Sequence, residues 1–436
     1  MRMQACKVSP RHFTRSGWSS LLPPRAPHDQ LPRERRFYAI VIGAGYTGLA
    51  AARRLAELMP NRQILIIEAL EIGEGLSARN SGFLLVYPNA PKAGASGPVD
   101  EDAIRKIRVA AAGLDWLRTL VADYNIECDW DEHAPRVTVA ATLAGERAAR
   151  DSVRSFKNWN MDLQEYNANE IGGLLGTGYY RYGYQPSARA LVQPAALVRG
   201  LSETLPHNVA ILENTPVCEI SSNAPFSVQT TRATFMADYL FVASNTHAGA
   251  FHPSLDRMVP VFTYGALTPQ LDADELGRLG SIPSWGVVPA LAMGTTMRKV
   301  NGRLLVRSGW SYAKEFNVVN VRSVLTMLFR RRFPAMRSYE FEHAWGGAIA
   351  STYNGEFYFG KVRPGLYASV GCAGAGVLRA TIHGKLLAEM AVGFQSPLLT
   401  DRLSLAGPSW LPPEPLRGMA ATAKLAWLDW RAGGER

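Results

Sequence analysis

The sequence has 436 residues, of which 47% are hydrophobic and only 19% are charged. These values exclude wholesale disorder and a single small domain, and they predict a large α/β domain or two intertwined domains. The net charge is +10, but residues 1–36 carry +6 of it, as eight Lys or Arg against two Asp or Glu, and this favours a solvated tail over a nucleic-acid partner.

The first predicted elements form a βαβ unit. Residues 1–36 are rich in proline and predict an irregular basic N-terminal arm. Residues 37–43 are a continuous apolar run, which is typical of a strand buried on both faces of a parallel sheet. Residues 49–58 predict a helix that ends before a proline, and residues 64–67 predict the second strand. This order and length indicate a βαβ unit.

Further helices and strands follow. An Asn-Gly pair at 301–302, between two apolar segments, predicts a β-hairpin. The tail at 424–430 is amphipathic, and we expect it to pack onto the body of the protein rather than onto a membrane. The other predicted helices are 101–122, 191–206, 378–390 and a short one that closes the chain. The other predicted strands are 136–141, two within 209–220, 238–244, 303–307 and 366–370.

The cysteines and the hydropathy limit the cellular compartment. Cys6, Cys128, Cys218 and Cys372 are far apart and form no cluster with histidines, so neither a disulfide framework nor a metal site is expected. No apolar run reaches the roughly 18–20 residues that a membrane-spanning helix needs. We therefore expect a cytoplasmic protein without membrane association, and its oligomeric state stays open.

A glycine-rich turn joins the first predicted strand to the first helix. It reads Gly43-Ala-Gly45-Tyr46-Thr47-Gly48, the GxGxxG pattern in the context that a dinucleotide site requires. The three glycines permit a tight turn, a close approach to a pyrophosphate and close packing of the helix on the strand. The free N–H groups of the helix N-terminus face the phosphates. Glu68, at the end of the second strand, is placed to accept hydrogen bonds from ribose hydroxyls.

Two further glycine-rich loops favour FAD over NAD. Residues 73–84 follow Glu68 closely, and residues 371–376 open a helix near the C-terminus. A flavin is long and needs backbone N–H groups beyond its pyrophosphate. The positive end of the second helix would also stabilise the electron-rich edge of a reduced flavin.

These motifs resemble the FAD-dependent amine and amino-acid oxidoreductases of the D-amino-acid oxidase and sarcosine oxidase type. The resemblance covers about residues 37–395. It is carried by residues 41–51 with Glu68, by 75–83, by 192–201 running to 213–217, and by 345–347 through 371–377.

The resemblance implies an α/β fold with a discontinuous, Rossmann-like FAD domain and an inserted α+β substrate domain built on an antiparallel sheet. The expected pieces are the arm (1–36), the FAD domain (37–100, 186–250 and 340–395), the substrate domain (101–185 and 251–339) and a C-terminal extension (396–436). The expected FAD-binding residues are Gly43, Gly45, Tyr46, Thr47, Gly48, Glu68, Ala69, Arg79, Asn80, Ser81, Gly82, Val217, Gly371, Ala373, Gly374, Gly376 and Val377.

Three departures from the family pattern bear on chemistry. The segment 344–348 has no cysteine and the Arg79 loop has no histidine, so the resemblance implies a noncovalent FAD. Leu378 and Arg379 stand where sarcosine oxidases carry a lysine that binds the substrate carboxylate. Arg307 falls roughly where relatives carry a lysine that activates oxygen. It either stabilises superoxide, binds a carboxylate or is a strand-surface residue, and it cannot shuttle protons because it stays charged.

The family implies hydride removal from the carbon that bears an amine, in an amino acid or a secondary or cyclic amine, with electrons passed to oxygen or a carrier. The candidate catalytic residues are Arg307 and Trp345, although Trp345 also suits a core position. The candidate substrate-binding residues are Tyr264, Arg298 and Tyr312. Two other functions stay open: an FAD monooxygenase, and a flavin-binding accessory subunit of a larger dehydrogenase.

Overall fold

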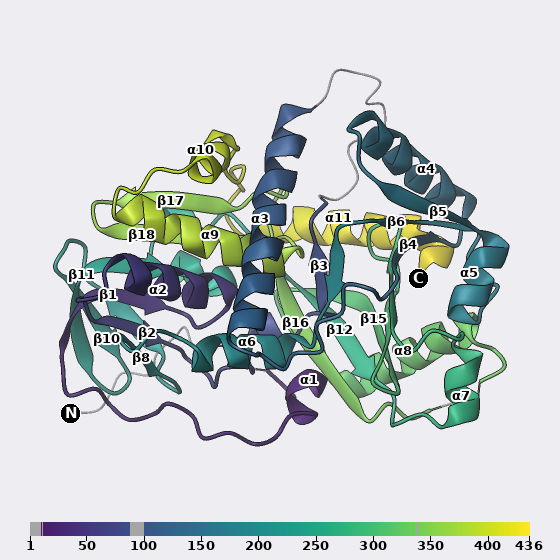
Figure 1. Ribbon diagram of the computed structural model, residues 1–436, viewed down its shortest axis with the longest axis horizontal. Helices are drawn as coiled ribbons and strands as arrows, with labels where there is room; N and C mark the ends of the chain where they lie inside the picture. The colour runs from purple at the N-terminus through teal and green to yellow at the C-terminus, as the bar shows by residue number, and fades with distance from the viewer. Residues whose placement is uncertain (1–9, 11, 88–99, 337–338) are drawn as a thin grey trace.

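The computed structural model describes residues 10, 12–87, 100–336 and 339–436. Two eight-stranded sheets stand side by side, with helices around them (Figure 1). The start of the predicted arm, the end of the first predicted FAD piece and the end of the second substrate piece lie outside the described residues.

The elements alternate along the chain between the two halves of the molecule. The α-helices are α1 (Gly17–Ser20), α2 (Tyr46–Leu58), α3 (Glu101–Asp123), α4 (Leu143–Asn158), α5 (Ala168–Leu175), α6 (Pro194–Glu203), α7 (Ala273–Arg278), α8 (Val318–Arg332), α9 (Gly376–Ala391), α10 (Pro397–Ser404) and α11 (Leu416–Ala432). Short 3₁₀ turns are η1 (Leu76–Ala78), η2 (Asn245–Ala250), η3 (Pro253–Leu255) and η4 (Gly433–Glu435). Within the described residues, no helix is long and apolar enough to cross a membrane.

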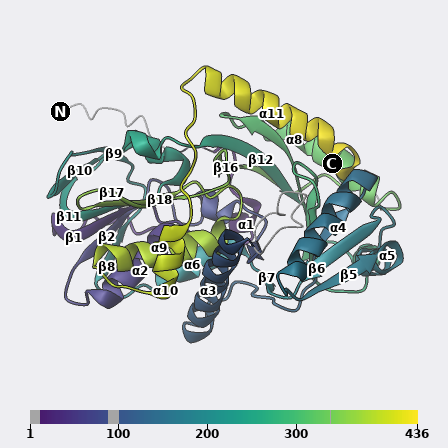
Figure 2. The ribbon, with the colours of Figure 1, turned by 90° about the horizontal axis from the view of Figure 1, so that it is seen from above.

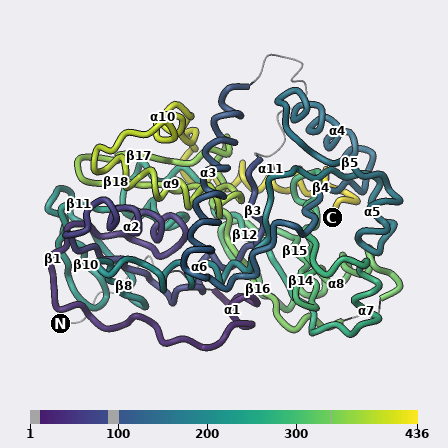
Figure 3. Tube along the Cα trace, viewed as in Figure 1, coloured from purple at the N-terminus to yellow at the C-terminus, as the bar shows by residue number. Residues whose placement is uncertain are grey.

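The first sheet has a parallel centre and antiparallel edges. Its order is β17 (Tyr358–Arg363), β18 (Leu366–Val370), β11 (Thr234–Val242), β1 (Arg36–Ile42), β2 (Ile64–Ile67) and β8 (Val209–Leu212). The pairs from β18 to β8 are parallel, while β10 (Phe226–Thr230) and β9 (Val217–Ile220) extend the sheet antiparallel from β11. Segments far apart in sequence thus lie side by side (Figure 3). Helix α2 packs against α9, and α9 against α3.

The second sheet is antiparallel except for one pair. Its order is β16 (His343–Ser351), β12 (Val259–Leu267), β15 (Arg303–Tyr312), β14 (Thr296–Val300), β13 (Trp285–Pro289), β4 (Arg136–Ala140), β6 (Tyr182–Pro186) and β5 (Leu163–Asn167). Only β13 and β4 run parallel. A two-stranded ladder of β3 (Phe83–Leu85) and β7 (Arg189–Leu191) is separate from both sheets.

Much of the local prediction is confirmed. Strands β1 and β2 flank α2 as a βαβ unit whose apolar strands are buried. The hairpin turns at Asn301 and Gly302, whose φ angles of 46° and 71° are left-handed as a tight hairpin turn requires. The mixed α/β fold class is also as predicted.

Four expectations need correction. Strand β16, expected in the third FAD piece, pairs with β12 in the second sheet. Helix α3, expected in the substrate domain, packs on α9. The helix near the C-terminus, α11, is 17 residues long rather than short. The arm is not simply solvated, because Trp18 in α1 is only 1% exposed. Three of these errors concern which surface an element packs against, which short-range patterns do not encode, and the fourth concerns the length of a helix.

Candidate functional site

A large cavity lies between the two sheets. On one side its walls come from the carboxyl ends of the parallel strands of the first sheet, where ligands of open α/β sheets bind. On the other side they come from the strands of the second sheet. The lining includes Gly43, Glu68, Asn245 and Cys372 from the first side, and Val288, Thr296, Thr263 and Arg307 from the second.

The first glycine loop opens the cavity at the start of α2. Gly43 has a φ of +107°, which favours glycine. A Cβ on Gly48 would lie 1.8 Å from the carbonyl oxygen of Gly43, so only glycine lets α2 pack this closely on its strand. Gly45, Tyr46 and Thr47 line the cavity, and the backbone N–H of Tyr46 lies 3.3 Å from Ser77 Oγ.

Helices α2 and α9 both begin at the cavity without a side-chain cap. Elsewhere in the described residues every α-helix except α11 has an Asn, Asp, Gln, Ser or Thr side chain that accepts a hydrogen bond from its first turn. The N–H of Tyr46 donates to Ser77 Oγ, but the N-cap residues of both helices leave the other N–H groups of the first turns uncapped. These groups and the positive dipole ends face the cavity from two directions, an arrangement that suits an anionic or electron-rich ligand.

Glu68 stands at the end of β2 beside this turn. Its two carboxylate oxygens accept hydrogen bonds from the backbone N–H groups of Ala44 at 2.8 Å and Leu70 at 3.0 Å. Burial raises the pKa of the Glu68 carboxyl group. Each oxygen keeps a second lone pair, so the carboxylate can still accept a hydroxyl from a ligand. Ala69 and Val217 line the same end of the cavity.

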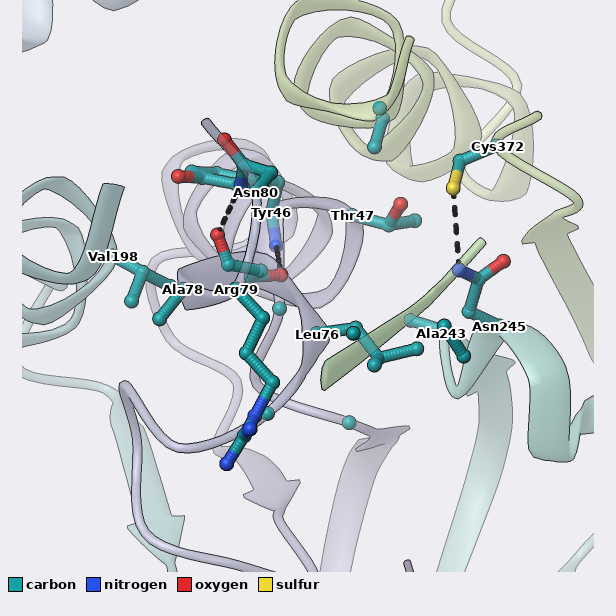
Figure 4. A pocket seen from close by; sticks show the side chains of 18 of the residues that line it. Tyr46, Thr47, Leu76, Ala78, Arg79, Asn80, Val198, Ala243, Asn245 and Cys372 are labelled. Carbon is teal, nitrogen blue, oxygen red and sulfur yellow. Dashed lines mark hydrogen bonds between the residues drawn. The ribbon is translucent and has the colours of Figure 1, made fainter. Parts of the chain in front are cut away.

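The second glycine loop is held by its own polar side chains. Asn80 donates to the carbonyl of Ser77 at 2.6 Å and accepts from the N–H of Gly82 at 2.8 Å. Arg79 points away from Asn245 and Cys372 (Figure 4), and its guanidinium donates to the backbone carbonyls of Glu74, Gly346 and Thr14. Arg79, Asn80 and Ser81 line the cavity; Gly82 is not among the lining residues.

The N-terminal arm holds this loop from the other side. Ser16 Oγ donates to the carbonyl of Ala78 at 2.8 Å, Trp18 Nε1 to that of Asn80 at 2.8 Å and Ser19 Oγ to that of Gly73 at 2.5 Å. Pro10 and His12 themselves line the cavity. The arm is therefore part of the site.

A buried ion pair anchors the arm further along. Arg25 Nη1 lies 2.9 Å from both carboxylate oxygens of Glu213, which is fully buried after β8. The same carboxylate accepts from the backbone N–H groups of His28 and Ile72. Satisfying the charge in this way makes its burial tolerable and fixes the arm against the first sheet.

The third glycine loop joins β18 to α9. Ala373 has a φ of +43°, between Gly371 at +92° and Gly374 at +88°. Asn245 secures the loop, because its Oδ1 accepts from the N–H of Gly371 at 3.0 Å and its Nδ2 lies 3.3 Å from Cys372 Sγ (Figure 4). From this loop and the start of α9, Cys372, Gly374, Gly376 and Val377 line the cavity, whereas Gly371 and Ala373 shape the turn behind it.

Arg307 brings a positive charge from β15 to the cavity. Its Nε and Nη2 donate to Thr263 Oγ1 at 3.1 and 2.8 Å. Burial lowers the pKa of Arg307 to about 10, so the side chain stays charged at neutral pH. Among the described residues, no carboxylate lies within ion-pair distance of it. A charge without a counter-charge at a cavity wall suits an anionic group of a ligand.

The other candidate catalytic and substrate-binding residues are not among the lining residues. Trp345 is 1% exposed, contacts Trp18 edge-on and donates to the carbonyl of Arg79, so it supports the second loop from behind. Arg298 is buried and donates to the carbonyls of Ser81 and Val192. Tyr264 is buried against Ser311, and Tyr312 bonds to Glu414 near α11.

Comparison with known proteins agrees with this geometry. Residues 39–390 match the family model described as FAD dependent oxidoreductase. The chain belongs to this family of FAD-dependent oxidoreductases. Curated relatives include a probable oxidoreductase, OrdL, of Haemophilus influenzae, 26% identical over 81% of this chain and 82% of the relative. Another is the gamma-glutamylputrescine oxidoreductase of Escherichia coli, 25% identical over 84% of this chain and 86% of the relative.

Solved structures share the fold of this FAD-dependent oxidoreductase. Glycine oxidase from Geobacillus kaustophilus aligns with a TM-score of 0.68 and 19% identity, over 83% of this chain and 96% of that one. The match of the family model to residues 39–390 leaves the whole arm (1–36) and all of α11 outside it.

Several residues that line the cavity were not predicted from the sequence. Ser77 lies within the second glycine loop, and Asn245 follows a strand of the parallel sheet, so both stand where ligands of such folds bind. Cys372 was visible inside the third glycine loop. His12 and Thr263 carried no local signal, since only tertiary packing brings the arm and β12 to the cavity.

Proposed function

We propose that this protein binds FAD noncovalently in the cavity between its sheets and removes a hydride from the C–H beside the amine of an amino acid or small amine. The substrate class is inferred chiefly from Arg307, which lies on the cavity wall opposite the glycine loops. This cation has no acidic partner among the described residues, so it can bind the carboxylate of an amino acid. The named relatives that act on gamma-glutamylputrescine and glycine support the class.

The chain offers a matching set of groups for each part of FAD. The uncapped start of α2 would hold the pyrophosphate, and Glu68 the ribose of the adenosine, beside Val217. The second loop and the uncapped start of α9 would hold the flavin ring. Bound FAD supplies the acceptor for the hydride. The first sheet would thus form the cofactor domain and the second sheet the substrate domain.

The residues of the second sheet would place the substrate. Arg307, held by Thr263, would bind a carboxylate and so fix the direction of the adjacent C–H. Phe83, Phe251 and Phe357 also line the cavity and would exclude water from it. Positioning of this kind requires no general base of unusual strength, because hydride transfer needs only a neutral amine and the correct geometry.

Anaerobic titration of the purified, FAD-loaded protein tests the reaction. Amino acids and secondary or cyclic amines are added one at a time, and the flavin absorbance near 450 nm, roughly where oxidised flavins absorb, is followed. A substrate should bleach the flavin, and readmitted air should then restore it quickly for an oxidase or slowly for a dehydrogenase. Bleaching by NADPH alone, with no response to any amine, would instead indicate a monooxygenase.

Acid precipitation tests the noncovalent attachment. The segment around β16 has no cysteine and the second loop has no histidine, so the flavin should remain in the supernatant. The test is demanding because Cys372 and His12 both line the cavity. Flavin that stays in the pellet would contradict the proposal, and the variants Cys372→Ser and His12→Ala would then locate the bond.

A further inference from the structure

Helix α11 lies on the outside of the molecule with a large apolar face turned to solvent. In Figure 2 it runs along the outer edge of the molecule, away from the first sheet. Its inner side, with Leu425 and Leu428 half-buried, packs against β15. The outer side carries Leu416, Met419, Ala423, Trp427 and Trp430, and of its four large residues Trp427 is the least exposed, at 51%.

These outer residues form one continuous stripe. Their spacing of three or four residues places them on a single face of an α-helix. Trp430 is 79% exposed and Trp410, just before the helix, is 70% exposed. A monomeric protein surface rarely keeps so many large apolar side chains together unless they meet a partner.

A second stripe, of basic residues, runs beside the apolar one. Arg417, Lys424 and Arg431 are seven residues apart and therefore share one face, next to the apolar stripe. Arg417 pairs with Asp256. Lys424 lies over the ring of Tyr353 and Arg431 over that of Trp427, and neither has a carboxylate in ion-pair distance among the described residues.

We propose that the exposed face of α11 docks on a lipid surface that contains anionic head groups. An apolar face with Trp and Leu, bordered by Lys and Arg, is the pattern of helices that lie in a membrane interface. Trp side chains favour that depth because they are apolar with one polar edge. The two unpaired cations would be complemented by anionic head groups, whereas a second copy of the chain would bring more positive charge to the same place.

The proposal departs from our sequence-based expectation that the tail packs onto the body. The helix does pack onto the body, but through the face that carries Leu425 and Leu428, so the apolar stripe on the other face remains exposed to solvent. The docking surface is independent of the proposed reaction, because none of its residues lines the cavity.

Flotation of the full-length, FAD-loaded protein with vesicles tests the proposal. Vesicles of phosphatidylcholine alone are compared with vesicles that contain phosphatidylglycerol as well. We expect binding to the anionic vesicles, and about tenfold or more weaker binding of the variants Trp427→Ser/Trp430→Ser and Lys424→Glu/Arg431→Glu. The second variant should fail only through the loss of charge attraction, so high salt should reproduce its effect on the unmodified protein.

Two matched variants control for general loss of apolar surface and of charge. Leu143→Ser/Leu403→Ser removes exposed apolar residues from α4 and α10, and Arg33→Glu/Arg147→Glu reverses exposed charges elsewhere. Both should bind vesicles as the unmodified protein does. Equal binding by all variants, or no binding by any, would overturn the proposal. A dimer in light scattering that Trp427→Ser/Trp430→Ser converts to a monomer would instead assign the face to a second copy of the chain.

Discussion

Two arginines on neighbouring strands, the buried Arg298 and the half-buried Arg307, have different hydrogen-bond partners. The guanidinium of Arg298, on β14, donates hydrogen bonds to the backbone carbonyls of Ser81 and Val192, behind the second glycine loop. Arg307 on β15 lies in the cavity wall and, among the described residues, donates only to the hydroxyl of Thr263. Burial lowers the pKa of both to about 10, so both remain charged at neutral pH. Of these two arginines, only Arg307 lines the cavity, where its charge can meet a ligand.

Replacing Arg307 should change substrate binding selectively. For Arg307→Ala we expect the KM for a carboxylate-bearing substrate to rise about 10- to 100-fold, since a charge-assisted hydrogen bond contributes roughly 1.5–3 kcal/mol. The KM for an amine without a carboxylate should change little. Arg303→Ala, on the same strand but paired with Glu342, is the control. An equal loss for both substrate types would show that Arg307 does not bind the carboxylate.

A single added methyl group should break the first glycine turn. Gly48→Ala would place its Cβ 1.8 Å from a backbone oxygen that cannot rotate away. We expect a loss of about 1–3 kcal/mol in the free energy of unfolding and a low flavin content. Gly173→Ala, in helix α5 and outside the cavity lining, is the control, because nothing lies within 4 Å of the added atom. Normal stability and flavin content in Gly48→Ala would contradict this account of the turn.

At the scale of elements, the arm and β16 act together on the second glycine loop. Trp18 of the arm contacts Trp345 of β16, and both donate hydrogen bonds to the backbone of that loop. Arg79 completes the arrangement with bonds to the carbonyls of Thr14 and Gly346. The loop is thus held by a segment before the βαβ unit and by a strand of the other sheet.

Removing the Trp18 side chain should loosen the cofactor site as well as the fold. We expect Trp18→Ala to cost about 3–5 kcal/mol of stability, because the indole is fully buried, and to weaken FAD binding. Thermal unfolding and flavin titration measure the two effects. Phe13→Ala, in the same arm but 67% exposed, should change neither. Unaltered FAD affinity in a folded Trp18→Ala protein would separate the arm from the site.

For the whole molecule, the position of the cavity couples the two sheets. Its walls come from both, so a ligand that fills it contacts both. Binding to the folded state alone stabilises it by about 2.7 kcal/mol when the ligand is at a hundredfold excess over its Kd. Ligand binding should therefore stabilise both sheets together rather than one of them.

Addition of FAD to the cofactor-free protein should raise the melting temperature by several degrees, across one shared transition. Differential scanning calorimetry at increasing FAD concentrations measures the shift. NAD at the same concentrations is the control and should have little effect. Two transitions, of which FAD moves only one, would show that the sheets unfold independently and that the cavity does not join them.

The sequence by itself determined the βαβ unit, the three glycine loops and the hairpin at Asn301. Each depends on residues close together in the chain: a buried strand before a glycine turn, an acid at the end of the next strand, or an Asn-Gly pair. These patterns also indicated FAD and the family. They did not reveal that Arg298 and Trp345 support the second loop from outside the cavity.

Only the tertiary structure decided which side chains share the cavity. His12, Thr263 and Arg307 come from the arm and from two strands distant in sequence. Within the part of the chain that the structure describes, Arg307 has no counter-charge, because its partner on β12 is the hydroxyl of Thr263. The same holds for α11, whose amphipathic sequence fits either packing or docking. Which of its faces is buried depends on β15, and long-range packing of this kind leaves no local pattern in the chain.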